Sequence, residues 1–211
     1  MKTDSFDTLL KASSLSVNNT LANKEAQQAL AKYGFTPQHA KAGKGLLTNC
    51  TKQDRAQKQY YETQWALNHR VKKELKTTRA QFVEHVNVAR FVFRKDAVML
   101  HQLGVQRLER TEAGWLKQAN AFYERITPHA AQLAPQGLTP EELAQTQASL
   151  QAIVELREEL ARTKGDAEDA TQRKLQAQRE LQAWLSEFRK VARLAFKKSP
   201  QKLEAFGIRV R

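Results

Sequence analysis

The stretch VARFVFRKDAVMLHQLGV at residues 88–105 recurs as VARLAFKKSPQKLEAFGI at residues 191–208. The match extends outward from there. Residues 30–105 align on residues 133–208 without a gap at a constant offset of 103, and 16 of those 76 pairs are identical. Self-similarity at one fixed period indicates that a chain is built from repeated structural units.

We therefore expect two tandem repeats, residues 1–105 and residues 106–211, that pack together as one domain. Such a chain is comparable to a homodimer fused end to end, so a pseudo-twofold relation between its halves is expected. The composition is rich in Ala, Leu, Gln, Glu, Lys and Arg, with only 8 Gly and 5 Pro. Because those abundant residues lose little side-chain entropy in a helix, the predicted class is all-α.

Signals for the end of one helix and the start of the next recur in both repeats. They are Gly34 followed by Thr36-Pro37, and Gly137 followed by Thr139-Pro140. Glycine ends a helix in the left-handed conformation, and the Thr-Pro pair supplies a cap and a first helical residue. Glu142 adds the second half of a capping box with Thr139.

From each Thr-Pro start a helical pattern runs for roughly 60 residues, which is long for a globular helix. Lys164-Gly165-Asp166 offers a break in the second repeat. We therefore expect a helical hairpin in each repeat, with helices at about 37–63 and 66–95 and at about 140–164 and 167–197. One continuous helix in each repeat is the alternative.

Shorter helices are expected on either side of each hairpin. The first helices should span about 5–20 and 106–126, and short closing helices should end at Gly104 and Gly207. The predicted architecture is thus an antiparallel helical bundle.

An apolar stripe with alternating spacings of four and three residues runs along the later helix of each hairpin. Its members are Leu181, Leu185, Phe188, Ala192 and Ala195, and in the first repeat Thr78, Phe82, His85, Ala89 and Val92. This spacing is typical of a helix that packs along another helix. We expect His85 to be a hydrogen-bonded core residue and Cys50 to be a small buried one.

Both repeats close with an A-R-x-x-[FL]-[RK] segment and an L-x-x-[LF]-G helix, at Ala89–Gly104 and Ala192–Gly207. In this the chain resembles uncharacterised bacterial proteins made of two tandem helical repeats. The resemblance implies the all-α repeat architecture and no particular activity.

The formal net charge is +13, and it is uneven: residues 1–105 carry +9 and residues 106–211 carry +4. A basic chain favours polyanionic partners such as nucleic acid. The candidate contacts are Arg70, Lys72, Lys73, Lys76, Arg90, Arg94, Lys95, Arg193, Lys197 and Lys198. An acidic helix within residues 139–172 lying against a basic one would neutralise part of this charge.

Tyr60, Tyr61 and Trp65 fall near the predicted hairpin tip, where they could anchor a protein partner. Catalytic serine motifs, phosphate loops and metal-ligand spacings are absent from the sequence. We therefore expect no enzyme, cofactor, metal or small-molecule substrate. A single cysteine and the lack of a long apolar run favour a cytoplasmic protein without a membrane span.

The favoured function is a non-enzymatic interaction or structural protein, acting as a scaffold, an adaptor or a self-assembling subunit. The alternative is a basic nucleic-acid-binding or nucleoid-associated protein.

Overall fold

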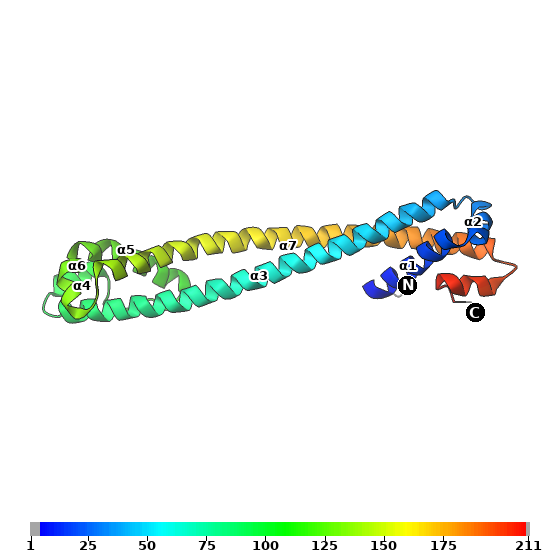
Figure 1. Ribbon diagram of the computed structural model, residues 1–211. Helices are drawn as coiled ribbons and strands as arrows, with labels where there is room; N and C mark the ends of the chain where they lie inside the picture. Colours follow the sequence, from blue (N-terminus) through cyan, green and yellow to red (C-terminus); the bar gives the residue numbers. More distant parts are fainter. Residues whose placement is uncertain (1–4, 210–211) are drawn as a thin grey trace. The chain divides into compact units, whose positions relative to one another are not determined.

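A computed structural model describes residues 5–209, and this part of the chain is entirely helical apart from its connections. It contains seven α-helices and three short 3₁₀ helices (Figure 1). The α-helices are α1 (Phe6–Ala22), α2 (Lys24–Ala31), α3 (Pro37–Val92), α4 (Ala97–Leu103), α5 (Glu112–Ile126), α6 (Ala130–Leu133) and α7 (Pro140–Ala195). The 3₁₀ helices are η1 (Thr127–His129), η2 (Ala134–Gln136) and η3 (Pro200–Phe206). None of the helices in the described part is both long and apolar enough to cross a bilayer.

The predicted hairpins are wrong, because α3 and α7 are each one continuous helix of 56 residues. Gly165 lies within α7, and a Cβ there would meet no atom within 4 Å. A glycine inside a helix costs only about 1 kcal/mol relative to alanine. That cost is small compared with the free energy gained by burying apolar side chains along a helix of this length. The glycine therefore does not end α7.

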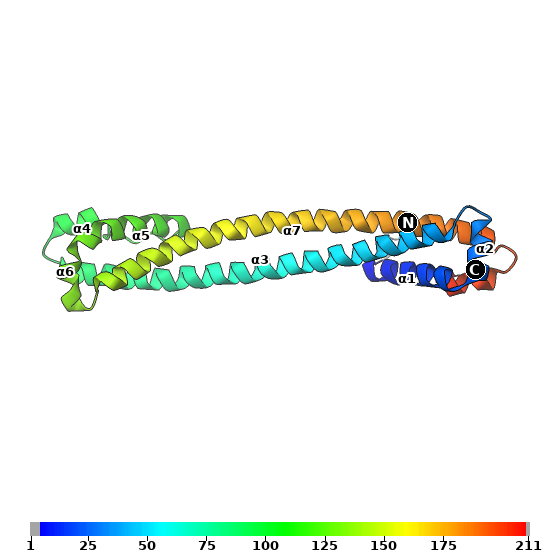
Figure 2. The same ribbon diagram turned by 45° about the horizontal axis from the view of Figure 1, so that its top comes forward.

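The chain divides into two compact units. Unit 1 comprises Met1–Glu62 and Gly165–Arg211, and unit 2 comprises Thr63–Lys164. In both units a segment of α3 runs antiparallel to a segment of α7 (Figures 1 and 2). Each unit thus combines residues from both halves of the sequence.

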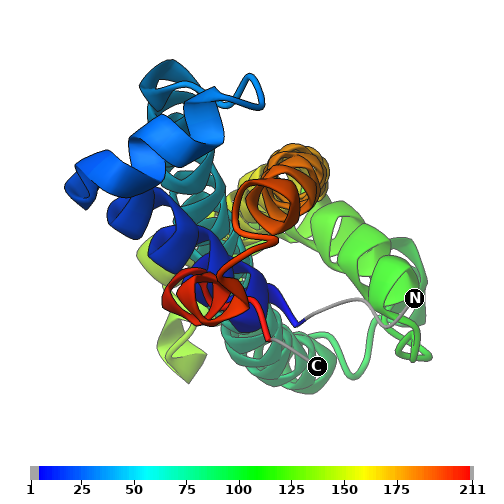
Figure 3. The ribbon, with the colours of Figure 1, turned by 90° about the vertical axis from the view of Figure 1, so that its right-hand side faces the viewer.

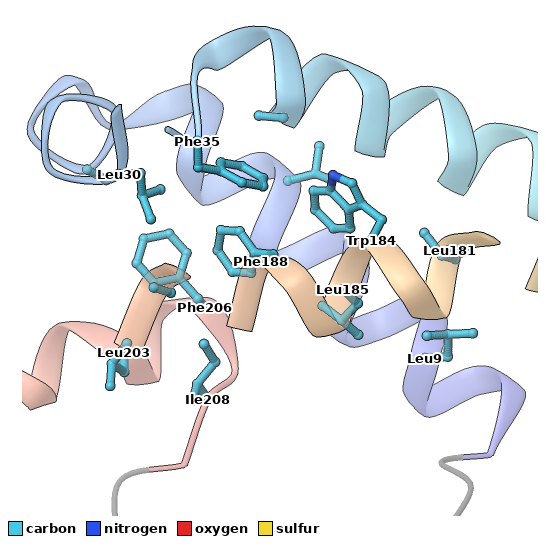
Figure 4. Packing of buried hydrophobic residues seen from close by; sticks show 14 of the residues in the cluster. Leu9, Leu30, Phe35, Leu181, Trp184, Leu185, Phe188, Leu203, Phe206 and Ile208 are labelled. Atoms are coloured by element: carbon cyan, nitrogen blue, oxygen red, sulfur yellow. The ribbon is translucent and has the colours of Figure 1, made fainter. Parts of the chain in front are cut away.

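The core of unit 1 is built around Phe188 of α7 (Figure 4). The Phe188 ring lies 5.3 Å from that of Phe35 and 5.5 Å from that of Phe206, measured between centroids. Both are edge-to-face contacts, the arrangement that aromatic pairs favour. Helices α1 and η3 lie side by side in this unit (Figure 3), where Ser16 donates a hydrogen bond to the carbonyl of Phe206.

The core of unit 2 brings α5 against α3. Phe82 of α3 packs edge-to-face on Phe122, with centroids 5.6 Å apart, and Trp115 and Tyr123 adjoin the same ring. All four aromatic side chains are buried, and the predicted helix 106–126 begins only at Glu112.

The predicted helix signals are confirmed. Helices α3 and α7 begin at Pro37 and Pro140, and the Thr139 backbone N–H donates to Glu142 Oε2 while the Glu142 N–H donates to Thr139 Oγ1. The glycines with positive φ are Gly34, Gly104, Gly137 and Gly207. The first and last residues of α7 each lie 103 positions after those of α3, which is the offset found in the sequence.

The predicted stripes face the cores. The buried members are Leu181, Leu185, Phe188 and Ala192 in unit 1, and Thr78, Phe82, His85 and Ala89 in unit 2. Cys50 is also fully buried, and burial raises the pKa of its thiol.

Candidate binding surfaces

Five of the predicted basic residues lie on the part of α3 that belongs to unit 2, and four of these lie within seven residues of one another. Arg70, Lys72, Lys73 and Lys76 are all exposed. None of them forms an ion pair with another described residue. The acidic residues of α7 therefore leave these four positive charges available for a ligand.

A groove of about 760 Å³ lies in unit 2 between α3 and the start of α5. Its cationic lining residues are Lys72, Lys76, Arg79 and Arg110, and its apolar ones are Leu75, Ala80, Val83 and Trp115. The single acidic lining residue, Glu112, forms a salt bridge with Arg157. The groove thus has a net positive lining above apolar side chains.

Arg79 is held in place at the wall of this groove. Its guanidinium lies 5.9 Å from the ring centroid of Trp115 and donates a hydrogen bond of 3.2 Å to the carbonyl of Glu109. A cation over an indole face is attracted by the negative charge of the π-system. Arg79 is therefore a fixed positive charge, whereas Lys72 and Lys76 are free to move toward a ligand.

A second hollow of about 460 Å³ continues along α3 and shares Ala80 and Val83 with the first. Its other lining residues are Glu84, Asn87, Val88, Phe91 and Gln136. Phe91 is 55% exposed, and the Arg94 guanidinium lies 4.8 Å from its ring centroid. We refer to the two hollows together as the α3 groove, which runs from Lys72 to Phe91.

The remaining predicted basic residues are not gathered at this groove. Arg90 donates hydrogen bonds to the carbonyls of Val105 and Gln106, so its guanidinium holds the chain that follows α4. Lys95 is exposed beyond the end of α3. Arg193, Lys197 and Lys198 are exposed on unit 1.

Unit 1 carries two further rows of exposed cations, and of their members only Arg193 was among the predicted contacts. One row on α3 consists of Lys41, Lys44, Lys52 and Arg55, and one row on α7 consists of Arg179, Lys190 and Arg193. At 100° per residue each row covers one face of its helix. Each row lies wholly within a predicted helix, at about 37–63 and about 167–197, so the spacing of these residues could have revealed both rows.

The predicted aromatic contacts lie in the middle of α3, not at a hairpin tip. Trp65 is 72% exposed and stacks on His69 at a centroid distance of 5.8 Å. Tyr61 is half exposed, with its hydroxyl 3.3 Å from Thr171 Oγ1, and Tyr60 is partly buried. Tyr60 and Tyr61 belong to unit 1 and Trp65 to unit 2.

Unit 1 also contains a polar cluster between α3 and α7. Asp54 lies 2.6 Å from Lys174 Nζ and 2.8 Å from Lys58 Nζ, and Lys174 also donates a 2.8 Å hydrogen bond to Gln57. Burial alone would raise the pKa of Asp54, but the hydrogen bonds from Lys174 and Lys58 hold it below its usual value. Gln57 in turn donates to Thr171, so each of these polar groups has a partner.

A hydrogen-bonded histidine lies in the core of unit 2, as predicted. His85 Nδ1 is 2.9 Å from the hydroxyl of Tyr123, which is also hydrogen-bonded to Thr146. Burial lowers the pKa of His85 and raises that of Tyr123, so both side chains are neutral at neutral pH.

Residues 5–209 contain no group of three or more His, Cys, Asp or Glu side chains placed to hold a metal ion. No protein-family model, curated protein or solved structure matches this chain.

Proposed function

We propose that the chain is a non-enzymatic interaction protein, and that the α3 groove of unit 2 binds an acidic amphipathic helix of a partner protein. The observation that carries the proposal is the pairing of unneutralised cations with apolar side chains along one face of α3. Helices that bind in grooves present apolar anchors at positions i, i+3 or i+4, and i+7. Acidic residues beside such anchors would face Lys72 and Lys76.

The length of the groove supports a helical ligand. The segment of α3 from Lys72 to Phe91 spans about 29 Å at 1.5 Å per residue. A ligand helix of about 20 residues would follow this whole distance. Its acidic end would lie near Lys76, and its apolar end would lie near Phe91.

The charge of the whole chain supports an acidic partner over a second copy. With a net charge of +13, two copies repel each other, whereas an acidic protein is attracted. Charged groups in such an interface set the association rate and the choice of partner, and the apolar contacts supply affinity.

The test measures the binding of a labelled acidic amphipathic peptide of about 20 residues by fluorescence anisotropy. A scrambled peptide of the same composition is the control ligand. The variant K72E/K76E should weaken binding at least about tenfold, because it reverses two charges of the groove. The matched control K41E/K44E, which alters unit 1, should change the affinity less than about twofold.

A second pair of variants tests the apolar part of the groove. Phe91→Ala should weaken binding of the peptide, and Leu194→Ala is its matched control. Leu194 occupies the position 103 residues after Phe91 and is likewise 55% exposed, but it lies in unit 1. Equal affinity for the scrambled peptide, or no effect of K72E/K76E, would overturn the proposal. Concentration-dependent sedimentation of the chain alone that K72E/K76E abolishes would instead make a second copy the ligand.

The recurrence of α3 and α7 at the offset of 103 residues supports an origin of the chain by tandem duplication. The two copies have then diverged in their interiors. Positions 67 and 71 of α3 and 156 and 160 of α7 form an apolar cluster in unit 2. Their counterparts at the same offset include Lys174 and Gln57 of the polar cluster in unit 1.

A further inference from the structure

Another hollow with a cationic lining lies in unit 2, between α4, α5 and η1 (Figure 1). It has a volume of about 540 Å³ and shares no lining residue with the α3 groove. Within residues 5–209 none of its lining residues is acidic. They are Met99, His101, Gln102 and Leu103 of α4, Arg125 of α5 and His129 of η1. We call this site the α4 hollow.

The two histidines of the α4 hollow have hydrogen-bonding groups left over. The side-chain nitrogen of Gln106 lies 3.1 Å from His101 Nδ1. Because an amide nitrogen only donates, Nδ1 accepts and Nε2 carries the ring proton. His129 contacts the ring of Phe93 edge-to-face at a centroid distance of 5.9 Å, and its ring nitrogens have no hydrogen-bond partner in the described part of the chain. Both imidazoles can therefore donate a hydrogen bond to a ligand.

Unit 1 contains a smaller hollow, of about 300 Å³, at corresponding positions of the sequence. Five of its lining residues lie 103 positions from lining residues of the α4 hollow. The counterparts of Met99, Gln102, Leu103, Arg125 and His129 are Lys202, Ala205, Phe206, Ala22 and Ala26. The fold thus forms a hollow in both units, whereas Arg125 and His129 are found in unit 2 alone.

Arg125 has more hydrogen-bond donors than its structural role requires. Its Nη1 donates a 2.6 Å hydrogen bond to the carbonyl of Gln102 at the end of α4. In unit 1 the corresponding carbonyl, that of Ala205, accepts from the side-chain nitrogen of Asn19, and Ala22 stands where unit 2 has the arginine. A short amide therefore suffices for this role. The other N–H groups of Arg125 have no hydrogen-bond partner among residues 5–209, so they are available to an anion.

We propose that the α4 hollow binds a small soluble phosphate monoester that carries an apolar group. A phosphate monoester has about two negative charges at neutral pH and three terminal oxygens, which match the donors of His101, Arg125 and His129. The fork of an arginine side chain pairs with two such oxygens at once. Met99 and Leu103 are buried beside these donors and supply an apolar contact. The volume lies in the range of small-molecule sites, about 300–1,000 Å³.

Isothermal titration calorimetry of the full chain tests this proposal with phenyl phosphate as the probe. Benzoate, inorganic phosphate and phenol are the comparison ligands, because they lack in turn the phosphate, the ring and the negative charge. Phenyl phosphate should bind at least about tenfold more tightly than each of them, since it alone contacts both the donors and the apolar wall.

Two variants place in unit 2 the residues that unit 1 has at the corresponding positions. Arg125→Ala and His129→Ala should each weaken the binding of phenyl phosphate at least about fivefold. His101→Ala alters an exposed side chain, so it tests the hollow without a loss of buried contacts. It should weaken binding at least about threefold. Circular dichroism establishes that each variant keeps its helical content.

The matched control is Arg70→Ala, which removes an exposed arginine of unit 2 outside both the α4 hollow and the α3 groove. It should change the affinity less than about twofold. The variant K72E/K76E should also bind phenyl phosphate like the parent. Loss of its peptide binding with retention of phenyl phosphate binding separates the α3 groove from the α4 hollow, so the two proposals fail independently.

Four results would overturn the proposal. The first is no binding of phenyl phosphate at about 1 mM. The second is an equal loss of affinity in Arg70→Ala and Arg125→Ala, which would mean attraction by the net charge alone. The third is benzoate binding as tight as that of phenyl phosphate, which would make the ligand a carboxylate. The fourth is binding of vesicles that contain phosphatidic acid without binding of phenyl phosphate, which would make the ligand a lipid headgroup.

Discussion

The indole of Trp184 fills the space that a side chain at position 43 would need. A Cβ built on Gly43 would lie 2.2 Å from two ring carbons of Trp184. The indole N–H donates a 3.0 Å hydrogen bond to the carbonyl of His39, one turn earlier on α3. Gly43 is thus the point at which α3 and α7 approach closely in unit 1.

Gly43→Ala should destabilise unit 1 by about 1–3 kcal/mol, the usual cost of overpacking a core. The hydrogen bond to His39 and the stacking on Phe188 hold Trp184 on both sides, so the indole cannot move away cheaply. Gly45→Ala is the matched control, since a Cβ there meets nothing within 4 Å. It should stabilise the helix by about 0.5–1 kcal/mol. Urea denaturation measures both, and a loss of stability in the two variants alike would contradict the packing account.

Asp54→Asn should destabilise the protein by about 1–3 kcal/mol at neutral pH, because it leaves Lys174 with no anionic partner and only the neutral Gln57 amide and Phe6 ring beside it. The folded-state pKa of Asp54 is depressed by its lysine partners. Asp54 therefore contributes fully to the free energy of unfolding above its unfolded-state pKa of about 3.9. This contribution is lost as the pH falls through the folded-state pKa. The parent should lose more stability on acidification than Asp54→Asn does.

The control for this acid titration is Asp166→Asn, which alters an exposed aspartate of the same unit. It should follow the parent curve. Parallel curves for the parent and Asp54→Asn would show that the cluster contributes no pH dependence.

The positions of the helix ends could be predicted from the sequence because they depend on local chemistry. Pro37 and Pro140 fix φ at a first helical residue, and Gly34 and Gly137 adopt positive φ that other residues avoid. The continuity of α7 through Gly165 could not be predicted in the same way. It depends on packing against α3, and a lone glycine is compatible with either a helix end or a helix interior.

The candidate surfaces also combine features that follow from local sequence with features that depend on tertiary packing. The basic character of α3 was evident from residue types, and Lys72 and Lys76 were predicted as contacts. The groove itself depends on α5, which brings Trp115 and Glu112 beside α3 through tertiary contacts between distant residues. Likewise, the stripe position of His85 indicated burial, but its partner Tyr123 is 38 residues away on another helix. No spacing rule in the sequence links those two residues.

His85 should make the stability of unit 2 depend on pH in the mildly acidic range. Burial lowers its folded-state pKa and outweighs the attraction of Glu142 and Glu84. The unfolded chain therefore binds the proton first, and stability falls as the pH drops below about 6.5 toward the folded pKa. His85→Gln should remove this part of the dependence. His69→Gln, which alters an exposed histidine of α3, should keep it, and urea titrations between about pH 5 and 8 compare the three proteins.

Gly165→Ala should stabilise the protein by about 1 kcal/mol, because alanine is the better residue inside a helix and its Cβ would meet nothing within 4 Å. A hairpin at Lys164-Gly165-Asp166 would require the opposite result, since a glycine that ends a helix in the left-handed conformation cannot be replaced without strain. Gly137→Ala supplies that comparison. Gly137 has φ +84°, and alanine there should cost about 1–2 kcal/mol although the space around it is equally open. Both substitutions replace an exposed glycine by alanine. A difference in the sign of their effects on stability therefore reports the difference in backbone conformation. Thermal unfolding of the pair measures it, and destabilisation by Gly165→Ala would mean that α7 is broken at this point in solution.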